Sequence, residues 1–256
     1  MPTNKKVVKM YNDKVIIEFF PDSHRYKKQG EKQYIPSVTT ITGIIDKSRQ
    51  LIYWAVNLTK NYLLDKYNSG ETIDIETIYE ACDQYNKKRD DAASIGTQVH
   101  DWAEKFSIAI RNSEPIPEIN KDFDDRVVMG INGFLDWVEE SKVKFIEAEK
   151  LVYSEKYNYC GLADAIVEIN GKKILVDYKT GKDIYSGMHY QVSAYVNAYN
   201  EEHEDKIQSA IIVHFNKETG VFKKKEISGK EVLLNMETFV SCLNIINREK
   251  QLKLEA

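Results

Sequence analysis

A single β-hairpin constrains the fold of this chain more than any other segment. Two apolar runs, residues 162–169 and 173–179, flank Asn170-Gly171, a dipeptide that is typical of a two-residue hairpin turn. Such a turn fixes the register of both strands, because each pair is reached by counting outward from the turn. The expected pairs are Ile169 with Lys172, Glu168 with Lys173, Ile166 with Leu175, and Asp164 with Asp177.

The last of these pairs, Asp164 with Asp177, indicates a cation-binding site. Opposed Cβ atoms in a sheet lie about 4.5–5.5 Å apart, and two like charges at that distance destabilise the strand pair. A hard divalent cation bound through oxygen ligands would turn the repulsion between Asp164 and Asp177 into binding energy. Lys179 lies on the same face, because side chains two residues apart on a strand point the same way, and it adds a positive charge. The alternative is that one aspartate lies at a frayed strand end and is simply solvated.

The composition is that of an ordinary globular protein, with 42% hydrophobic and 30% charged residues among 256. This length allows one good core, or a core with an appended subdomain, and no Pro/Gly/Ser-rich linker divides the chain. We therefore expect an N-terminal hairpin and helical subdomain at 1–95 and a catalytic core at 96–256. No apolar run approaches the ~20 residues of a membrane span, and no signal-like stretch follows the N-terminus, so we expect a soluble intracellular protein without membrane contact.

Cysteine content and charge argue against several classes of protein. Cys82, Cys160 and Cys242 are odd in number, widely spaced and without a Cys-x-x-Cys motif, which argues against a disulfide framework and a zinc ribbon. The net charge of −4 argues mildly against binding nucleic acid through bulk attraction, although clustered carboxylates would lower the total without affecting a local basic groove. No Gly-x-x-x-x-Gly-Lys-Ser/Thr motif occurs, so a built-in ATP motor is not expected.

The order of periodic segments predicts an α/β fold with a mixed central β-sheet flanked by helices. Two N-terminal strands are expected at 15–20 and 25–35. Apolar residues then recur at helical spacing in the next part of the chain, at 38–45, 49–67, 73–111 and 122–142. The expected order from Phe145 onward is strands at 145–153, 162–169 and 173–179, a helix at 187–201, strands at 207–215 and 221–227, and a closing helix from Lys230.

Two pairs of polar residues on helices are candidates for the same site. His100 and Glu104 are four apart on one helix face, where a carboxylate can orient an imidazole that binds a metal, although a simple surface pair is the alternative. Gln191 and Tyr195 are also four apart, on the helix after the 173–179 strand, so both can face the end of that strand. Half-buried surface positions are the alternative for this pair.

Glu149 belongs to the strand before the hairpin. If the connection between the two strands is centred on Lys156-Tyr157, Glu149 falls opposite Asp164 and extends the acidic row. The connection carries no firm turn signal, so Glu147, on the same strand face, is an alternative.

These motifs resemble, in order and spacing, those of the PD-(D/E)XK nuclease superfamily, in particular the RecB-like branch that includes many phage and recombination exonucleases. The matching pieces are Gly96-Thr97-x-x-His100-x-x-x-Glu104, Glu149 before a strand, Gly161-x-x-Asp164, Asp177-Tyr178-Lys179-Thr180-Gly181, and Gln191-x-x-x-Tyr195. They span residues 96–199. His24-Arg25-Tyr26, and Pro36-Ser37-Val38-Thr39 with Trp54, are similar to the N-terminal portion of phage members, but less specifically.

The resemblance implies a restriction-endonuclease-like core and a metal-dependent DNA phosphodiester hydrolase. An exonuclease that acts on DNA ends or single strands, in recombination, repair or phage replication, is favoured. The implied partners are DNA and a replication or recombination protein, in the cytoplasm of a bacterial or phage-infected host cell. Some relatives hold an iron–sulfur cluster on four cysteines, and the three scattered cysteines here argue against such a cluster.

The resemblance also implies roles for individual residues. Mg²⁺ or Mn²⁺ would be bound by His100, Asp164, Asp177 and the backbone carbonyl of Tyr178, with one or two ions left open. The other implied catalytic residues are Lys179, which would hold or help deprotonate the attacking water, Glu149 at the edge of the cluster, and Gln191, which with Tyr195 would support Lys179 or the substrate backbone.

The helical region at 37–140 is expected to form a wall or an arch for DNA over the sheet. Its candidate contacts are Lys60, Lys87, Lys88 and Arg89 to phosphates, Trp54, Tyr62 and Tyr85 to bases, and Ser37 and Thr39 to a phosphate at a helix start. Solvated helix faces, core packing and ordinary N-capping are the alternative explanations.

Two other functions are compatible with these residues. A nucleic-acid-binding or assembly protein could keep the same fold without cleavage, although such a protein would be expected to lose an aspartate or the lysine that this chain retains. Lys179 could instead form a Schiff base with a carbonyl substrate. Two facing carboxylates would not help that reaction.

Overall fold

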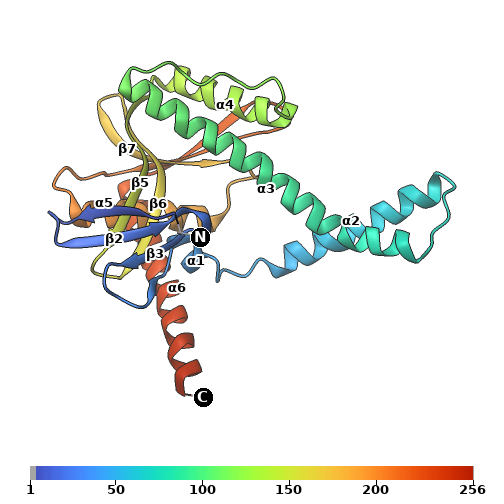
Figure 1. The fold of residues 1–256 in the computed structure, drawn as a ribbon, viewed down its shortest axis with the longest axis horizontal. Coiled ribbons are helices and arrows are strands. Elements are labelled where there is room, and N and C mark those ends of the chain that lie inside the picture. Colours follow the sequence, from blue (N-terminus) through green and yellow to red (C-terminus); the bar gives the residue numbers. More distant parts are fainter. Residues whose placement is uncertain (1–3, 256) are drawn as a thin grey trace.

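The structure, a computed structural model, describes residues 4–255, which form two β-sheets and a set of α-helices (Figure 1). The larger sheet has the strand order β5-β6-β7-β8-β9. Its strands are β5 (Lys144–Ser154), β6 (Tyr159–Ile169), β7 (Lys172–Lys179), β8 (Ala210–Phe215) and β9 (Phe222–Ile227). Only β7 and β8 pair in parallel, so the sheet is mixed. The parallel pair is connected by a helix, as a crossover of this kind requires.

The smaller sheet is antiparallel and lies at the N-terminus, with the order β1-β2-β3-β4. Its strands are β1 (Lys6–Met10), β2 (Val15–Phe20), β3 (Arg25–Lys28) and β4 (Tyr34–Ile35). The helices are α1 (Val38–Thr42), α2 (Ser48–Asn68), α3 (Ile75–Asn112), α4 (Asp125–Ser141), α5 (Ser186–Glu202) and α6 (Gly229–Glu255), with a short 3₁₀ turn at Pro21–Ser23. The predicted α/β class with a mixed, helix-flanked sheet is confirmed. The expected N-terminal hairpin is part of a larger sheet, because β1 adds a strand that the sequence did not indicate.

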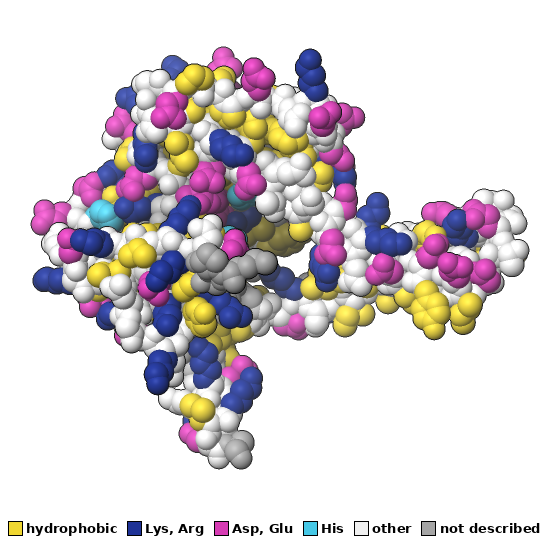
Figure 2. Space-filling view, in the orientation of Figure 1, with side chains coloured by type: hydrophobic (Ala, Val, Ile, Leu, Met, Phe, Trp, Pro, Cys, Tyr) yellow, Lys and Arg dark blue, Asp and Glu magenta, His cyan; other side chains and the backbone are white. Residues whose placement is uncertain are grey.

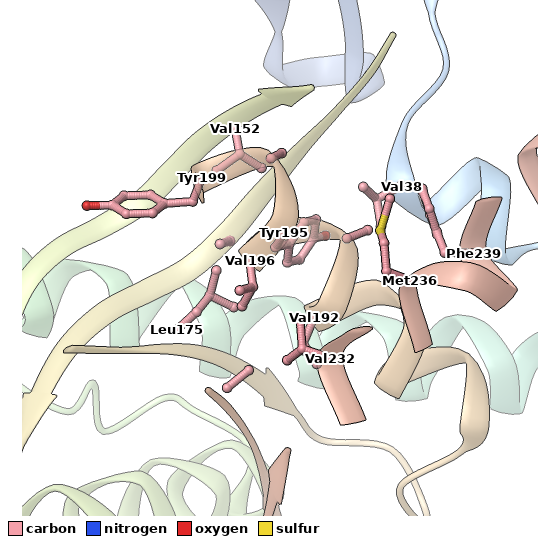
Figure 3. Close-up of a cluster of buried hydrophobic side chains, with 14 of the residues drawn as sticks. Val38, Val152, Leu175, Val192, Tyr195, Val196, Tyr199, Val232, Met236 and Phe239 are labelled. Atoms are coloured by element: carbon pink, nitrogen blue, oxygen red, sulfur yellow. The ribbon is translucent and has the colours of Figure 1, made fainter. Parts of the chain in front are cut away.

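Apolar side chains cover both faces of the five-stranded sheet. On one face, residues of α5 and α6 pack on the sheet together with Val38 and Ile41 of α1 (Figure 3). On the other face, α3 and α4 contribute an aromatic cluster that includes Trp102, Phe134 and Trp137. The strands between them are therefore buried on both sides, which explains the continuous apolar runs of β7 and β8.

The register predicted for the central hairpin is confirmed over the paired part of β6 and β7. Ile169 pairs with Lys172, and the ladder continues to Ala165 and Val176. Asn170 and Gly171 both have positive φ, of 52° and 72°, as a tight two-residue turn requires. Asp164 and Asp177 come next in the same count, one step beyond the last pair.

The helices α2 and α3 form an arm. α2 lies beside the N-terminal part of α3, and together they project away from both sheets (Figure 1). None of the described α2 residues is buried, whereas the C-terminal half of α3 packs against the large sheet. α3 is continuous through residues 95 and 96, so the expected division between 1–95 and 96–256 falls inside one helix and stays a prediction.

Within residues 4–255, the helices lack any stretch that is both apolar enough and long enough to cross a bilayer.

Candidate active site

Asp164 and Asp177 lie side by side where the β6-β7 ladder ends. Oδ2 of Asp164 accepts a hydrogen bond from the backbone N–H of Tyr178 at 2.6 Å, which ties this carboxylate to the neighbouring strand. Asp177 is buried, with 2% of its surface exposed. The hairpin register therefore brings two carboxylates together at the point where β6 and β7 stop pairing, as the sequence predicted.

Lys179 supplies a cation to this pair. Its Nζ lies 2.5 Å from Oδ2 of Asp177, and both side chains are largely removed from solvent. Among the described residues, however, this buried oxygen has no partner in a well-directed hydrogen bond. Asp177 thus combines a close charge contact with an unused hydrogen-bond acceptor, and an unpaired buried acceptor is unfavourable unless another group binds it.

His100 reaches the same cluster from α3. Its Nδ1 lies 3.5 Å from Oδ1 of Asp164, and its ring contacts Tyr178 edge to face. The carboxylate paired with His100 is thus Asp164, which the motif resemblance also groups with it, whereas helical spacing had suggested Glu104 as its neighbour. Gly96, one turn earlier, allows this approach, because a Cβ there would lie 2.8 Å from Oγ1 of Thr180.

Gln191 of α5 holds Asp177, and Tyr195 of the same helix holds Gln191. Nε2 of Gln191 donates to Oδ1 of Asp177 at 3.3 Å and to the hydroxyl of Tyr195 at 2.9 Å. The prediction that this pair faces the end of the strand is confirmed, but the group that Gln191 contacts is Asp177 and not Lys179. Tyr195 is buried against Gly161, where a Cβ would lie only 2.3 Å from its ring.

Glu149 falls opposite Asp164 in the register of β5 and β6. Its neighbours on β5 pair with Ala165 and Ala163, and the strands meet at Ser154 and Tyr159, as expected for a connection centred on Lys156-Tyr157. Glu149 itself has a positive φ of 46°, which interrupts the regular ladder. Its alternative, Glu147, forms an ion pair with Lys150 at 2.9 Å.

Burial and neighbouring charges separate the protonation behaviour of the two aspartates. Burial raises the pKa of Asp177 to about 6; Lys179 opposes this shift and the charge of Asp164 adds to it. Burial also disfavours the charged form of Asp164, but His100 and Lys179 outweigh it and lower its pKa. Asp177 is therefore the carboxylate whose negative charge is less well compensated.

The carboxylates raise the pKa values of the two basic groups in the site, His100 and Lys179. Burial favours the neutral forms of His100 and Lys179, yet Asp164 raises the pKa of the imidazole and Asp177 raises that of the ammonium. Glu149 and Glu104 both have raised pKa values, chiefly because of burial, and the negative charge of Glu104 adds to the shift at Glu149. The acidic row thus extends from the aspartates toward these two glutamates.

Three predicted substrate contacts lie outside this cluster. Oγ of Ser37 accepts a hydrogen bond from the backbone N–H of Thr40 at 3.0 Å and so caps α1, and it also contacts the hydroxyl of Thr39. Trp54 lies on the arm, where its ring packs edge to face on Tyr85 with 5.2 Å between centroids. Their predicted contacts with DNA stay predictions.

The donor chemistry of the cluster fits a hard divalent cation. Carboxylate oxygens and an imidazole nitrogen are suitable ligands for Mg²⁺ or Mn²⁺, and Oδ2 of Asp177 is a buried oxygen without a hydrogen bond. Across residues 4–255, no three side chains of His, Cys, Asp or Glu already surround one point as a complete ligand set. An ion would therefore compete with the contacts that His100 and Lys179 make with the aspartates.

Comparison with known proteins gives weak similarities. No protein-family model matches the sequence, and a search of curated proteins found no match. Among solved structures, the chain is similar to the alkaline exonuclease LHK-Exo from Laribacter hongkongensis, with a TM-score of 0.32 and 11% identity over 60% of this chain and 85% of that one. The complex of LHK-Exo with dAMP matches at a TM-score of 0.32 and 12% identity, with the same coverage.

A further solved structure, SSO0001, matches at a TM-score of 0.29 and 16% identity over 44% of this chain. The match spans only 56% of the SSO0001 chain. The function is therefore inferred from the residues of the site itself.

Proposed function

We propose that this protein is a metal-dependent hydrolase of DNA phosphodiester bonds, acting as an exonuclease on DNA ends or single strands. The observation that carries the proposal is the buried group of Asp164, Asp177 and Lys179 at the end of the β6-β7 hairpin, with His100 against it. Phosphodiester hydrolysis needs a bound cation, an oriented water and a positive charge near the phosphate, and these side chains can serve all three needs. The motif resemblance supports DNA as the substrate.

In this proposal Asp164, Asp177, His100 and the backbone carbonyl of Tyr178 hold Mg²⁺ or Mn²⁺, with Glu149 at the edge of the site. The bound ion would lower the pKa of water and stabilise negative charge on the phosphate. The nearness of these groups supports the proposal, since the hairpin register and the packing of α3 bring them together where β6 and β7 stop pairing.

The remaining residues of the site bind and orient. The ammonium of Lys179 attracts a phosphate oxygen and helps to direct the attacking water, because it is held beside Asp177 in a site with little solvent. Gln191 fixes Oδ1 of Asp177, and Tyr195 fixes Gln191, so both act as positioning residues. Tyr195 is too buried to be a major contact surface for DNA.

The test is release of nucleotides from linear DNA with Mg²⁺, with Mn²⁺ and with EDTA. Asp177→Ala and Lys179→Ala are each expected to lower the rate by at least about a hundredfold, because each removes a group that acts on the reacting phosphate. The matched control is Lys172→Ala, which removes an exposed lysine at the other end of β7. Equal rates for the wild type and both site variants would reject the proposed site.

The preference for ends is tested separately. Circular single-stranded DNA should resist the enzyme, while linear DNA labelled at its 5′ or 3′ end should lose its label or shorten progressively. Rapid cleavage of the circle would show an endonuclease. Binding of DNA without turnover under either metal ion would support the nucleic-acid-binding alternative.

A further inference from the structure

The outer end of the arm carries an unusual combination of side chains. We define the arm tip as residues 64–83, which comprise the end of α2, the connecting turn and the start of α3. Large hydrophobic side chains are exposed throughout it, and two tyrosines, Tyr67 and Tyr79, are each 71% exposed. The other exposed apolar residues of the arm tip are Leu64, Ile73, Ile75 and Ile78. Clustered exposure of this kind marks interaction surfaces, whereas single exposed apolar residues are common.

The arm tip is also strongly acidic. Its acidic residues are Asp65, Glu71, Asp74, Glu76, Glu80 and Asp83, and its one basic residue is Lys66. Lys66 is itself neutralised by an ion pair with Glu71 at 2.5 Å. Figure 2 shows hydrophobic side chains along one edge of the outer arm, with acidic side chains beside them.

This charge decides between classes of partner. Phosphate groups of DNA would be repelled by the arm tip, because binding of nucleic acid depends on neutralisation by Lys and Arg. A symmetric contact between two arm tips would also bring like charges together. The basic residues expected to contact phosphates are Lys60, Lys87, Lys88 and Arg89, and all four lie outside the arm tip. Their contacts with DNA stay predictions.

We propose that the arm tip is a docking surface for a second, different protein, whose matching surface is apolar and rimmed by lysine and arginine. The exposed isoleucines and tyrosines supply the apolar contact area, and tyrosine suits such a role because its rigid ring buries a large area at low conformational cost. The surrounding carboxylates select a basic partner and accelerate its association. The tip stands away from the sheets, so a partner can approach it from several sides.

The arrangement of the tip leaves these side chains available. The hydroxyl of Tyr62 donates to Glu80 at 2.5 Å, and the side chain of Asp74 caps α3 by accepting from the backbone N–H of Thr77 at 2.9 Å. These contacts hold the two helices and the turn in shape. Tyr67, Ile75 and Tyr79 are each at least 70% exposed, so their side chains are available for contact.

The test uses the purified full chain and two labelled amphipathic helical peptides with the same pattern, one of leucine and lysine and the other of leucine and glutamate. Fluorescence anisotropy should give a dissociation constant at least about tenfold lower for the lysine peptide, and added salt should raise it. A photoreactive group on Cys82, which is exposed while Cys160 and Cys242 are buried, should crosslink the bound peptide to the arm tip.

Two variants separate the apolar and electrostatic contributions. Tyr67→Ser/Tyr79→Ser should weaken binding of the lysine peptide at least about tenfold, and so should Asp65→Lys/Glu76→Lys, since all four positions are exposed. The control is Leu233→Ser, which makes a similar change at a 70% exposed position on α6. Circular dichroism should show that all the variants are folded, and nucleotide release from DNA should stay at the wild-type rate.

Three results would overturn the inference. The first is equal binding of both peptides, or lysine-peptide binding that the two arm-tip variants do not weaken. The second is concentration-dependent self-association that Tyr67→Ser/Tyr79→Ser abolishes, because the occupant would then be a second copy of this chain. The third is a loss of single-stranded DNA binding in the same variant, which would assign the arm tip to nucleic acid.

Discussion

At the scale of single residues, two glycines allow the close packing of helices on strands that forms the candidate site. Gly161 lets Tyr195 of α5 approach β6, and Gly96 lets α3 approach Thr180 at the end of β7. The sequence motifs contained both glycines. Spacing alone could not indicate which side chain each one contacts, nor that Asp164 rather than Glu104 lies beside His100, because these contacts depend on how distant helices pack on the sheet.

Gly161→Ala is expected to push the ring of Tyr195 away and so weaken the hydrogen bond by which Gln191 holds Asp177. Overpacking of this kind costs about 1–3 kcal/mol of unfolding free energy. The displaced carboxylate should lower nuclease activity at least about tenfold, since small errors in the position of catalytic groups reduce rates strongly. Urea unfolding and nucleotide release measure the two effects.

Gly187→Ala is the matched control on α5, because an added Cβ there would meet Ile45 at an ordinary contact distance of 3.6 Å. It should not lower the unfolding free energy, because alanine has a higher helix propensity than glycine. If Gly161→Ala behaved like this control in both measurements, the packing of Tyr195 would have no influence on the site.

At the scale of secondary structure, the central hairpin shows what local sequence can determine. The turn at Asn170-Gly171 fixed the register, and the register placed Asp164 next to Asp177. The connection at Lys156-Tyr157 was also correct, although it lacks a strong turn signal. β1 was missed because Lys6–Met10 is short and its apolar residues do not alternate regularly with polar ones, and such alternation is the pattern that identifies a half-buried strand.

Gly171→Ala should destabilise the hairpin. Gly171 has a φ of 72°, and a residue with a Cβ in this left-handed region costs about 1–2 kcal/mol. Chemical denaturation should therefore show a loss of about that size. Gly181→Ala is the comparison, because an added Cβ there meets no atom within 4 Å and its φ lies outside the left-handed region. A loss equal to that of Gly181→Ala would mean that the turn does not need the glycine.

At the scale of the whole molecule, the end of α5 joins the two sheets. The carboxylate of Glu201 accepts hydrogen bonds from Oγ of Ser154 at 2.8 Å and from Nδ2 of Asn197 at 2.7 Å. Glu202 accepts from the backbone N–H of Tyr11, which follows β1, at 2.8 Å. The small sheet is thereby fixed to the core, although the sequence had indicated only a separate N-terminal hairpin.

Glu201→Ala is expected to lower the unfolding free energy by about 1–3 kcal/mol, because it leaves buried or half-buried donors without their acceptor. The connection at 155–158 should also become more sensitive to proteolysis, since the backbone N–H of Lys156 donates to Glu201. Glu204→Ala, at an exposed position two residues after α5, should leave both properties unchanged. Equal proteolysis of the two variants would contradict this role.

The periodicity of the sequence predicted the helices of the arm but not their projection from the molecule. Apolar positions on α2 fall on more than one side of the helix, and local pattern does not say which sides a tertiary contact will cover. The expected boundary at residues 95 and 96 has the same origin, because a motif begins at Gly96 while the helix that carries it began twenty-one residues earlier, at Ile75.

The unbroken helix α3 connects the arm tip to the candidate site. α3 has 38 residues and contains no proline, so it forms a rod about 57 Å long from Ile75 to Asn112. His100 lies on this rod, twenty-five residues after Ile75, so a protein bound at the arm tip would contact the same continuous helix that places the imidazole beside Asp164.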